Sequence, residues 1–300
     1  MPAVRVEDVL TLPVVALEDA TLRPRPVLGV NTAPSGFEGE GFPVRRAFAG
    51  IDRKYLDPFI HMDQMGEVEY APGEPKGTPW HPHRGFETVT YMLAGRMRHA
   101  DNKGHSGLLR PGSVQWMTAG RGIVHSEMPE QEEGLMWGFQ LWVNLPAKDK
   151  MTAPRYQEFD PADVPLAELP GGVRVRVIAG TIAGVTGPVN GIATMPTLMD
   201  VELPAGGTFA HDLPAGHNVF VYPFEGDVSV GDPAVAVPRG TLAALGPGTR
   251  VSFVAGSAPS RVLLAAAQPL DEQIVRYGPF VMNTPDQIRA AIADFQAGRF

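Results

Sequence analysis

The chain has 300 residues, of which 44% are hydrophobic, and its 25 Lys and Arg against 33 Asp and Glu give a formal charge of −8. It is long enough for one large or two ordinary domains with a buried core, and its acidic balance argues against direct binding to nucleic-acid backbones. The absence of cysteine excludes disulfides, thiolate metal sites and cysteine nucleophiles.

Targeting signals are not evident in the sequence. The first eight residues carry acidic side chains where a signal peptide needs an apolar core, and no apolar run reaches the length of about 18 residues that a membrane span requires. We therefore expect a cytoplasmic protein that does not enter the membrane. The 34 glycines and 30 prolines are dispersed as turn residues, which indicates many short strands.

The first third of the chain predicts short strands without a long helix. Prolines at positions 24, 26 and 34 interrupt the apolar segments of residues 1–43, which indicates edge strands and loops. Two further strands are expected within residues 46–50 and 56–63. His61 lies in the second of them, between Ile60 and Met62, and we expect it to be a structural or surface histidine.

The next segment contains half of a possible metal site. His81 and His83 are two residues apart, and on an extended chain this spacing directs both imidazoles to one side. An isolated pair of this kind also occurs in proteins without metal. A second pair, His125 and Glu127, begins 42 residues after His83 and has the same spacing. Together they offer three nitrogens and one carboxylate, which suit Fe(II), Mn(II), Ni(II) or Zn(II) and leave two octahedral positions open.

The middle of the chain predicts a hairpin and then a domain boundary. Strands are expected at residues 114–118 and 123–127 around a glycine turn, so that the second ligand pair can fold back over the first. An apolar strand follows at residues 135–144. Five prolines and mixed charges mark residues 146–170 as a linker between an N-terminal domain of residues 1–145 and a C-terminal domain of residues 171–300.

The second half repeats the rhythm of the first, with short strands separated by Gly and Pro turns, and reads as a duplicated β-barrel. The metal pattern does not repeat, because His211 and His217 are six residues apart. One helix is expected at the C-terminal end, where Thr284 and Gln287 form a capping box and Pro285 occupies the first helical position.

The two ligand pairs and their surroundings resemble the pirins, iron-containing members of the cupin superfamily. The matching segments are residues 56–59, 81–89, 115–129, 140–146 and 277–284. The resemblance implies an all-β bicupin, in which two antiparallel jelly-roll β-barrels face each other and a short C-terminal helix follows. It also implies that only the N-terminal barrel holds metal.

The same resemblance implies which residues bind the metal. By position they are His81, His83, His125 and Glu127, with Fe(II) expected and Ni, Mn, Zn or Cu as alternatives. General cupin motifs place a glutamate shortly after the H-x-H pair, where this chain has Glu87. Strand alternation would put Glu87 on the face of the two histidines, so we expect it to orient an imidazole or to act as a base.

The resemblance implies an enzyme of the quercetin 2,3-dioxygenase type, which opens a flavonol ring with O2. We expect a small planar aromatic substrate, a monomer, and a base that is either Glu127 or Glu87. The alternative is a non-catalytic, iron-dependent regulatory protein that binds a transcription factor or a metabolic enzyme; a third function is that of an isomerase using the metal as a Lewis acid. Candidates for the pocket wall are Trp80, Phe86, Trp116, Met117 and Met136.

Overall fold

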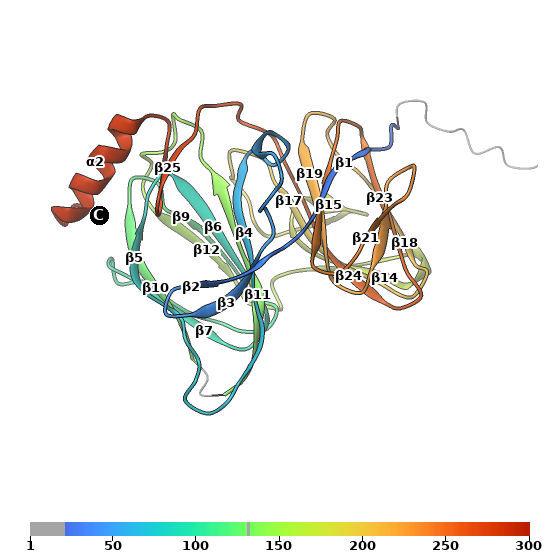
Figure 1. The fold of residues 1–300 in the computed structure, drawn as a ribbon, viewed down its shortest axis with the longest axis horizontal. Helices are drawn as coiled ribbons and strands as arrows, with labels where there is room; N and C mark the ends of the chain where they lie inside the picture. The colour runs from blue at the N-terminus through green and yellow to red at the C-terminus, as the bar shows by residue number, and fades with distance from the viewer. Residues whose placement is uncertain (1–21, 131–132) are drawn as a thin grey trace, which may run out of the picture.

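The protein is built from two β-barrels that lie side by side (Figure 1). The computed structural model describes residues 22–130 and 133–300, so the apolar segments expected before residue 22 lie outside the described residues. Each barrel combines a seven-stranded and a four-stranded antiparallel sheet. This is the expected all-β bicupin architecture.

The N-terminal barrel contains the strands β2 to β12. Its large sheet has the order β12-β9-β6-β11-β4-β3-β2, and its small sheet has the order β5-β10-β7-β8. The strands are β2 (Ser35–Glu38), β3 (Phe42–Arg46), β4 (Phe59–Tyr70), β5 (Thr78–His83), β6 (Phe86–Ala94), β7 (Met97–Asp101), β8 (Ser106–Leu109), β9 (Val114–Thr118), β10 (Ile123–Pro129), β11 (Gly134–Asn144) and β12 (Arg155–Phe159).

The C-terminal barrel repeats this plan. Its large sheet has the order β1-β22-β19-β24-β17-β14-β13, and its small sheet has the order β18-β23-β20-β21. The strands are β1 (Val27–Thr32), β13 (Leu166–Leu169), β14 (Val173–Ala179), β17 (Thr197–Leu203), β18 (Thr208–Asp212), β19 (Asn218–Glu225), β20 (Val228–Val230), β21 (Val235–Val237), β22 (Thr241–Leu245), β23 (Arg250–Ala255) and β24 (Ser260–Ala267). A separate hairpin pairs β15 (Thr181–Ile182) with β16 (Val185–Thr186).

The large sheets of the two barrels share one hydrophobic core. It includes Tyr91 and Phe139 from the N-terminal barrel and Phe220 and Phe224 from the C-terminal one, all nearly inaccessible to solvent. The hydroxyl of Tyr91 donates a hydrogen bond of 2.7 Å to Asp200 across this boundary. Because each large sheet has a second apolar face turned toward its neighbour, the barrels bury these faces against each other.

Strand pairing crosses the domain limits expected from the sequence. β1 precedes the N-terminal barrel in the chain but pairs with β22 of the C-terminal barrel. The expected linker, residues 146–170, contains β12, which extends the N-terminal large sheet, and β13, which extends the C-terminal one. The physical reason is that a sheet edge leaves backbone N–H and C=O groups unpaired, and extended segments nearby satisfy them.

The C-terminal segment returns to the N-terminal barrel (Figure 1). It forms β25 (Val275–Tyr277), β26 (Phe280–Met282) and the helix α2 (Pro285–Gln296), which has the expected capping box of Thr284 and Gln287. Ile288 of α2 is buried against Phe280, as the apolar face of the helix predicts. Within residues 22–130 and 133–300, no helix is long and apolar enough to cross a membrane.

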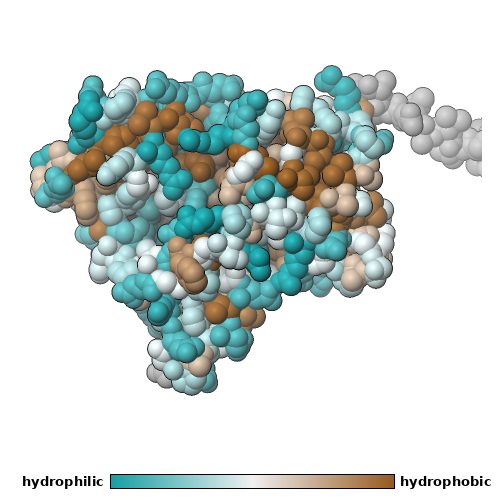
Figure 2. Space-filling model, viewed as in Figure 1, coloured by the Kyte–Doolittle hydropathy of each residue, from teal (hydrophilic) through white to brown (hydrophobic). Residues whose placement is uncertain are grey.

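Apolar side chains also reach the surface in places. Figure 2 shows a hydrophobic band near α2 and a second patch over the C-terminal barrel in the area of β1. Leu28 and Val30 of β1 are 42% and 41% exposed. Polar residues lie between these two apolar areas in this view.

Candidate metal centre

Three histidines meet where β5 pairs with β10. The antiparallel register places His125 opposite His81, and His83 lies two residues further along β5 on the same face. The ring centroids are 4.7 Å apart for His81 and His83, 4.4 Å for His81 and His125, and 4.9 Å for His83 and His125. One ring nitrogen of each histidine lies within 4.8 Å of the other two.

The chemistry of these nitrogens fits a bound metal ion. Neither ring nitrogen of His125 has a hydrogen-bond partner among the described residues, although the residue is fully buried. A buried polar atom without a partner costs about 1–3 kcal/mol, a cost that a ligand–metal bond removes. Burial, with the positive charge that His125 and His81 can carry, lowers the pKa of His83 well below its usual range. Burial likewise lowers the pKa of His125 to about 4, so both rings are held in the neutral form that binds metal.

His81 is oriented by the backbone. Its Nδ1 lies 2.7 Å from the carbonyl oxygen of Pro79, so a hydrogen on Nδ1 donates to that oxygen and leaves the Nε2 lone pair available. This Nε2 lies 3.0 Å from His83 Nε2. The two nitrogens therefore face the same point, as two ligands of one ion do.

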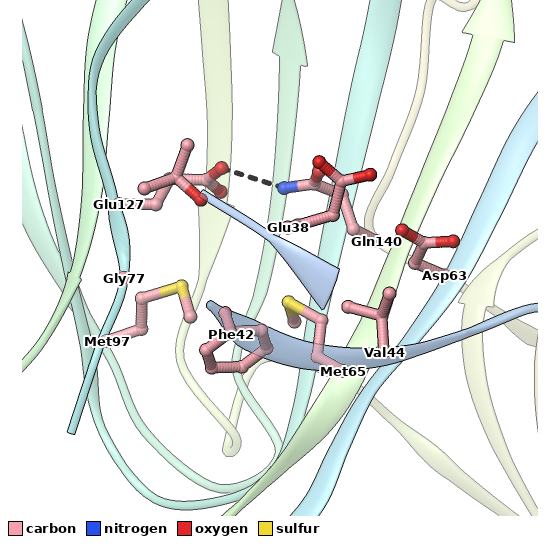
Figure 3. Close-up of a pocket in the computed structure, with 10 residues that line it drawn as sticks. Glu38, Phe42, Val44, Asp63, Met65, Gly77, Met97, Glu127 and Gln140 are labelled. Atoms are coloured by element: carbon pink, nitrogen blue, oxygen red, sulfur yellow. Dashed lines mark hydrogen bonds between the residues drawn. The ribbon is translucent and has the colours of Figure 1, made fainter. Parts of the chain in front are cut away.

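Glu127 lines the same cavity as His81 and His83, and Figure 3 shows its hydrogen bond with Gln140. Thr90 donates a hydrogen bond of 3.2 Å to Oε1, and Gln140 Nε2 donates one of 2.8 Å to Oε2. Burial by itself raises the pKa of Glu127. His125, His81 and the two hydrogen bonds together lower the pKa by more than burial raises it, so the net shift is downward. Glu127 is therefore an ionised, fixed carboxylate on the wall of the cavity that His81 and His83 also line, although it lies outside the group of donor atoms within 4.8 Å that the three histidines form.

Glu87 does not share the face of His81 and His83. β5 ends at His83 and β6 begins at Phe86, and Gly85 between them has a φ of +89°, so the alternation of one strand does not continue into the next. The buried Glu87 side chain instead accepts a hydrogen bond of 2.7 Å from Thr118. Thr90 is three positions after Glu87 on β6, so its side chain points to the opposite face of the strand, where it reaches Glu127. Burial raises the pKa of Glu87.

A cavity of about 320 Å³ opens beside the histidines. Two cross-strand pairs form much of its wall, because β4 and β11 place His61 opposite Trp142 and Asp63 opposite Gln140. The guanidinium group of Arg276, from β25, lies 4.7 Å from the Trp142 ring centroid. The lining residues are Glu38, His61, Asp63, Thr78, His81, His83, Glu127, Gln140, Trp142, Arg276, Gly278 and Pro279.

The apolar wall differs from the one expected. Trp80 is 58% exposed, while Phe86, Trp116, Met117 and Met136 are buried in the core, and none of the five lines this cavity. Behind Glu127 and Gln140 lies a smaller space of about 30 Å³ (Figure 3). Its apolar lining comes from Phe42, Val44, Met65 and Met97.

The sequence predicted a structural or surface role for His61, which instead lines the cavity, and its patterns did not single out Asp63, Gln140 or Trp142. Each pair has the same i, i+2 spacing as the histidine pair, which places its members on one face of a strand. That signal was present in the sequence. It becomes informative only once β4 is known to pair with β11 and to face the small sheet.

Known proteins share both halves of this chain. Residues 41–143 match the family described as Pirin, and residues 198–300 match the Pirin C-terminal cupin domain. A Pseudomonas aeruginosa protein named "Putative quercetin 2,3-dioxygenase" is 47% identical over 281 residues, which cover 92% of this chain and 98% of that protein. A Caulobacter vibrioides protein named "Pirin-like protein" is 45% identical over 277 residues, which cover 92% and 99% of the two chains.

A solved structure agrees with these sequence matches. The crystal structure named quercetin 2,3-dioxygenase from Acinetobacter baumannii superposes with a TM-score of 0.86 at 36% identity, over 93% of this chain and 99% of that one. The match extends through both barrels. On this evidence the chain belongs to the pirin family.

Proposed function

We propose that this protein is a metal-dependent dioxygenase that opens the ring of a flavonol, in the manner of a quercetin 2,3-dioxygenase. One observation carries the proposal: His81 and His83, which cluster with His125, line a cavity of about 320 Å³ together with the ionised Glu127, and this volume is within the range of small-molecule sites. The relatives that carry the dioxygenase name support it, since they match nearly the whole chain.

The proposed metal ligands are His81, His83, His125 and Glu127, and the proposed metal is Fe(II), with Ni, Mn, Zn or Cu as competitors for a nitrogen and carboxylate set. When bound, the metal would act as a Lewis acid and as the redox partner of dioxygen. The chain prepares the ligands in advance. Pro79 orients His81, and Gln140 and Thr90 hold Glu127, so little reorganisation is needed when the ion enters.

The cavity wall would position the substrate. Trp142 offers an aromatic edge and Arg276 stacks over its ring, an arrangement that suits a planar molecule with an acidic hydroxyl. Of the two carboxylates expected to act as base, only Glu127 lines this cavity. Both of its oxygens accept hydrogen bonds, so we propose it as a ligand.

The experiment is turnover by defined metal forms. The protein is loaded with Fe(II) without oxygen and mixed with quercetin, and air is then admitted while the flavonol absorbance band and released carbon monoxide are followed. We expect the band to bleach with wild type and with the exposed-histidine control His105→Ala, and to persist with His81→Ala. Intact quercetin with the iron-loaded wild type would contradict the proposal and favour the regulatory alternative.

A further inference from the structure

We propose that His61 and Asp63 form a proton-accepting dyad in the metal cavity, which takes the proton of an acidic phenol or enol hydroxyl of the substrate. This inference rests on the proposed function, because it names the base for the same site. His61 Nε2 lies 3.1 Å from Asp63 Oδ2, and both side chains line the cavity that contains His81, His83 and Glu127.

Strand register places the dyad. His61 and Asp63 are two residues apart on β4, so they share a face, and that face is opposite Trp142 and Gln140 of β11. The His61 and Trp142 ring centroids are 5.0 Å apart. The dyad therefore lies against the same tryptophan that Arg276 contacts, on the wall of the cavity.

Asp63 is prepared to support a charged imidazole. Its side chain is only 4% exposed, and its Oδ1 is buried without a hydrogen-bond partner. A buried carboxylate next to an imidazole fixes the tautomer and stabilises the imidazolium that forms on proton uptake. His61 itself is 15% exposed, which leaves the ring accessible from the cavity.

The other candidate bases are occupied or distant. Glu87 faces Thr118 on the other side of its sheet. Glu127 accepts hydrogen bonds at both oxygens and is the proposed carboxylate ligand of the metal. The remaining carboxylate of the cavity wall, Glu38, is paired with Arg46. The dyad is the group on this wall that combines an accessible nitrogen with a dedicated carboxylate.

The proposed step is a balanced proton transfer. The substrate O–H bond breaks, and an N–H bond forms at Nδ1 of His61, because Nε2 carries the hydrogen that faces Asp63. The substrate becomes an anion and the imidazole a cation, and the same proton returns to the product. No further reactant is required. Several other charged groups adjoin His61 around its two neighbouring cavities: Glu38, Arg46, Arg53, Glu127 and Arg276.

The arginines near the dyad weigh against a second metal ion there. Glu38, His61 and Asp63 present donor atoms within 4.8 Å of one another, a spacing that could also hold a cation. However, Arg276 lies on the same wall, and Arg46 and Arg53 line the adjoining cavity with it. The guanidinium groups offset the negative charge of Glu38, Asp63 and Glu127, so a second dication would be bound less strongly than the carboxylates alone would allow.

The test uses 4-nitrocatechol, a chromophoric diphenol whose successive ionisations change its visible spectrum. Nickel-loaded protein binds the probe without oxygen while the pH is varied, so no turnover is needed. We expect the second hydroxyl of the bound probe to ionise at least about one pH unit higher in His61→Gln than in wild type, which is about a tenfold change in the ionisation constant. Asp63→Asn should fall between them. His105→Gln is the matched control, because His105 is exposed and does not line the cavity.

Each outcome decides the proposal. An equal ionisation midpoint in wild type and both dyad variants, at equal nickel content, overturns it, as does a wild-type protein that leaves the probe spectrum unchanged. Metal analysis that finds two ions per chain in wild type and one in His61→Gln also overturns it, in favour of a second cation site. The proposed function is tested separately: if quercetin survives but the probe still shows the His61-dependent shift, the dioxygenase proposal fails and the dyad stands.

Discussion

Arg84 Nη1 lies 2.8 Å from Asp294 Oδ2, so the helix α2 is tied to the residue that directly follows His83. Arg84 is 4% exposed; its Nε donates to the carbonyl oxygen of Arg121 and its guanidinium lies 4.3 Å from the Phe300 ring centroid. The C-terminal segment therefore supports the strand end that carries two of the histidines.

Replacing Arg84 with Ala should weaken both the fold and metal binding. Loss of charge-assisted hydrogen bonds from a buried guanidinium should lower the free energy of unfolding by about 2 kcal/mol. We expect a lower urea midpoint and a faster loss of metal to a chelator. Arg289→Ala is the control, because Arg289 lies on the same helix in an exposed ion pair with Asp286. Equal midpoints for the two variants would show that the Arg84 contacts contribute nothing.

Variants of Glu127 and Glu87 should differ in metal content. Glu127→Ala should lose most of its metal, because the carboxylate lines the cavity of His81 and His83, whereas Glu87→Ala should retain it, because Glu87 contacts Thr118 and does not line that cavity. Elemental analysis of both proteins, purified without chelator, measures this directly. The opposite pattern would return Glu87 to the ligand set.

Gln140 should tune the metal site through Glu127. Gln140→Met removes the 2.8 Å hydrogen bond to Oε2 while conserving side-chain volume, and loss of such an orienting partner typically costs about 10–100-fold in metal affinity. Competition with a chromophoric chelator measures the change. Gln157→Met provides the comparison, since that amide bonds the backbone of Asn190 at an exposed position; a similar loss in both variants would rule out a specific effect.

The metal-free protein should lose stability as the pH falls from about 6.5 to about 4. Burial lowers the pKa of His125 to about 4, so between these values the unfolded chain binds a proton that the folded chain does not. The full difference corresponds to about 3 kcal/mol. Urea unfolding at several pH values should show a shallower slope for His125→Leu than for wild type. Parallel slopes would contradict the lowered pKa.

Lys150 should produce a second pH dependence at alkaline pH. Its buried Nζ donates to Gly85 O, Asn144 Oδ1 and Val281 O, and burial lowers its pKa to about 8. Between pH 8 and about 10.5 the unfolded chain therefore keeps a proton on Lys150 that the folded chain has lost. The free energy of unfolding should rise with pH over this interval. The urea midpoint of wild type relative to Lys150→Met should increase over this interval; a constant difference would disprove the shift.

Local patterns in the sequence determined much of the protein. The capping box of Thr284 and Gln287, the many short strands and the histidine pairs depend on neighbours a few residues apart, so they could be predicted. The spacing of His125 and Glu127 likewise predicted a second pair of ligands for the metal site. The structure places His81, His83 and His125 together as expected.

Only the tertiary structure decided which further residues join them. Gly85 breaks the strand, so Glu87 turns away from the face that alternation predicted. The pairing of β4 with β11 brings His61 and Asp63 into the cavity, and the returning C-terminal segment adds Arg276. These placements depend on register and backbone pairing between segments far apart in the chain, and the free energy that selects them comes from burial of whole sheet faces, which no short sequence pattern contains.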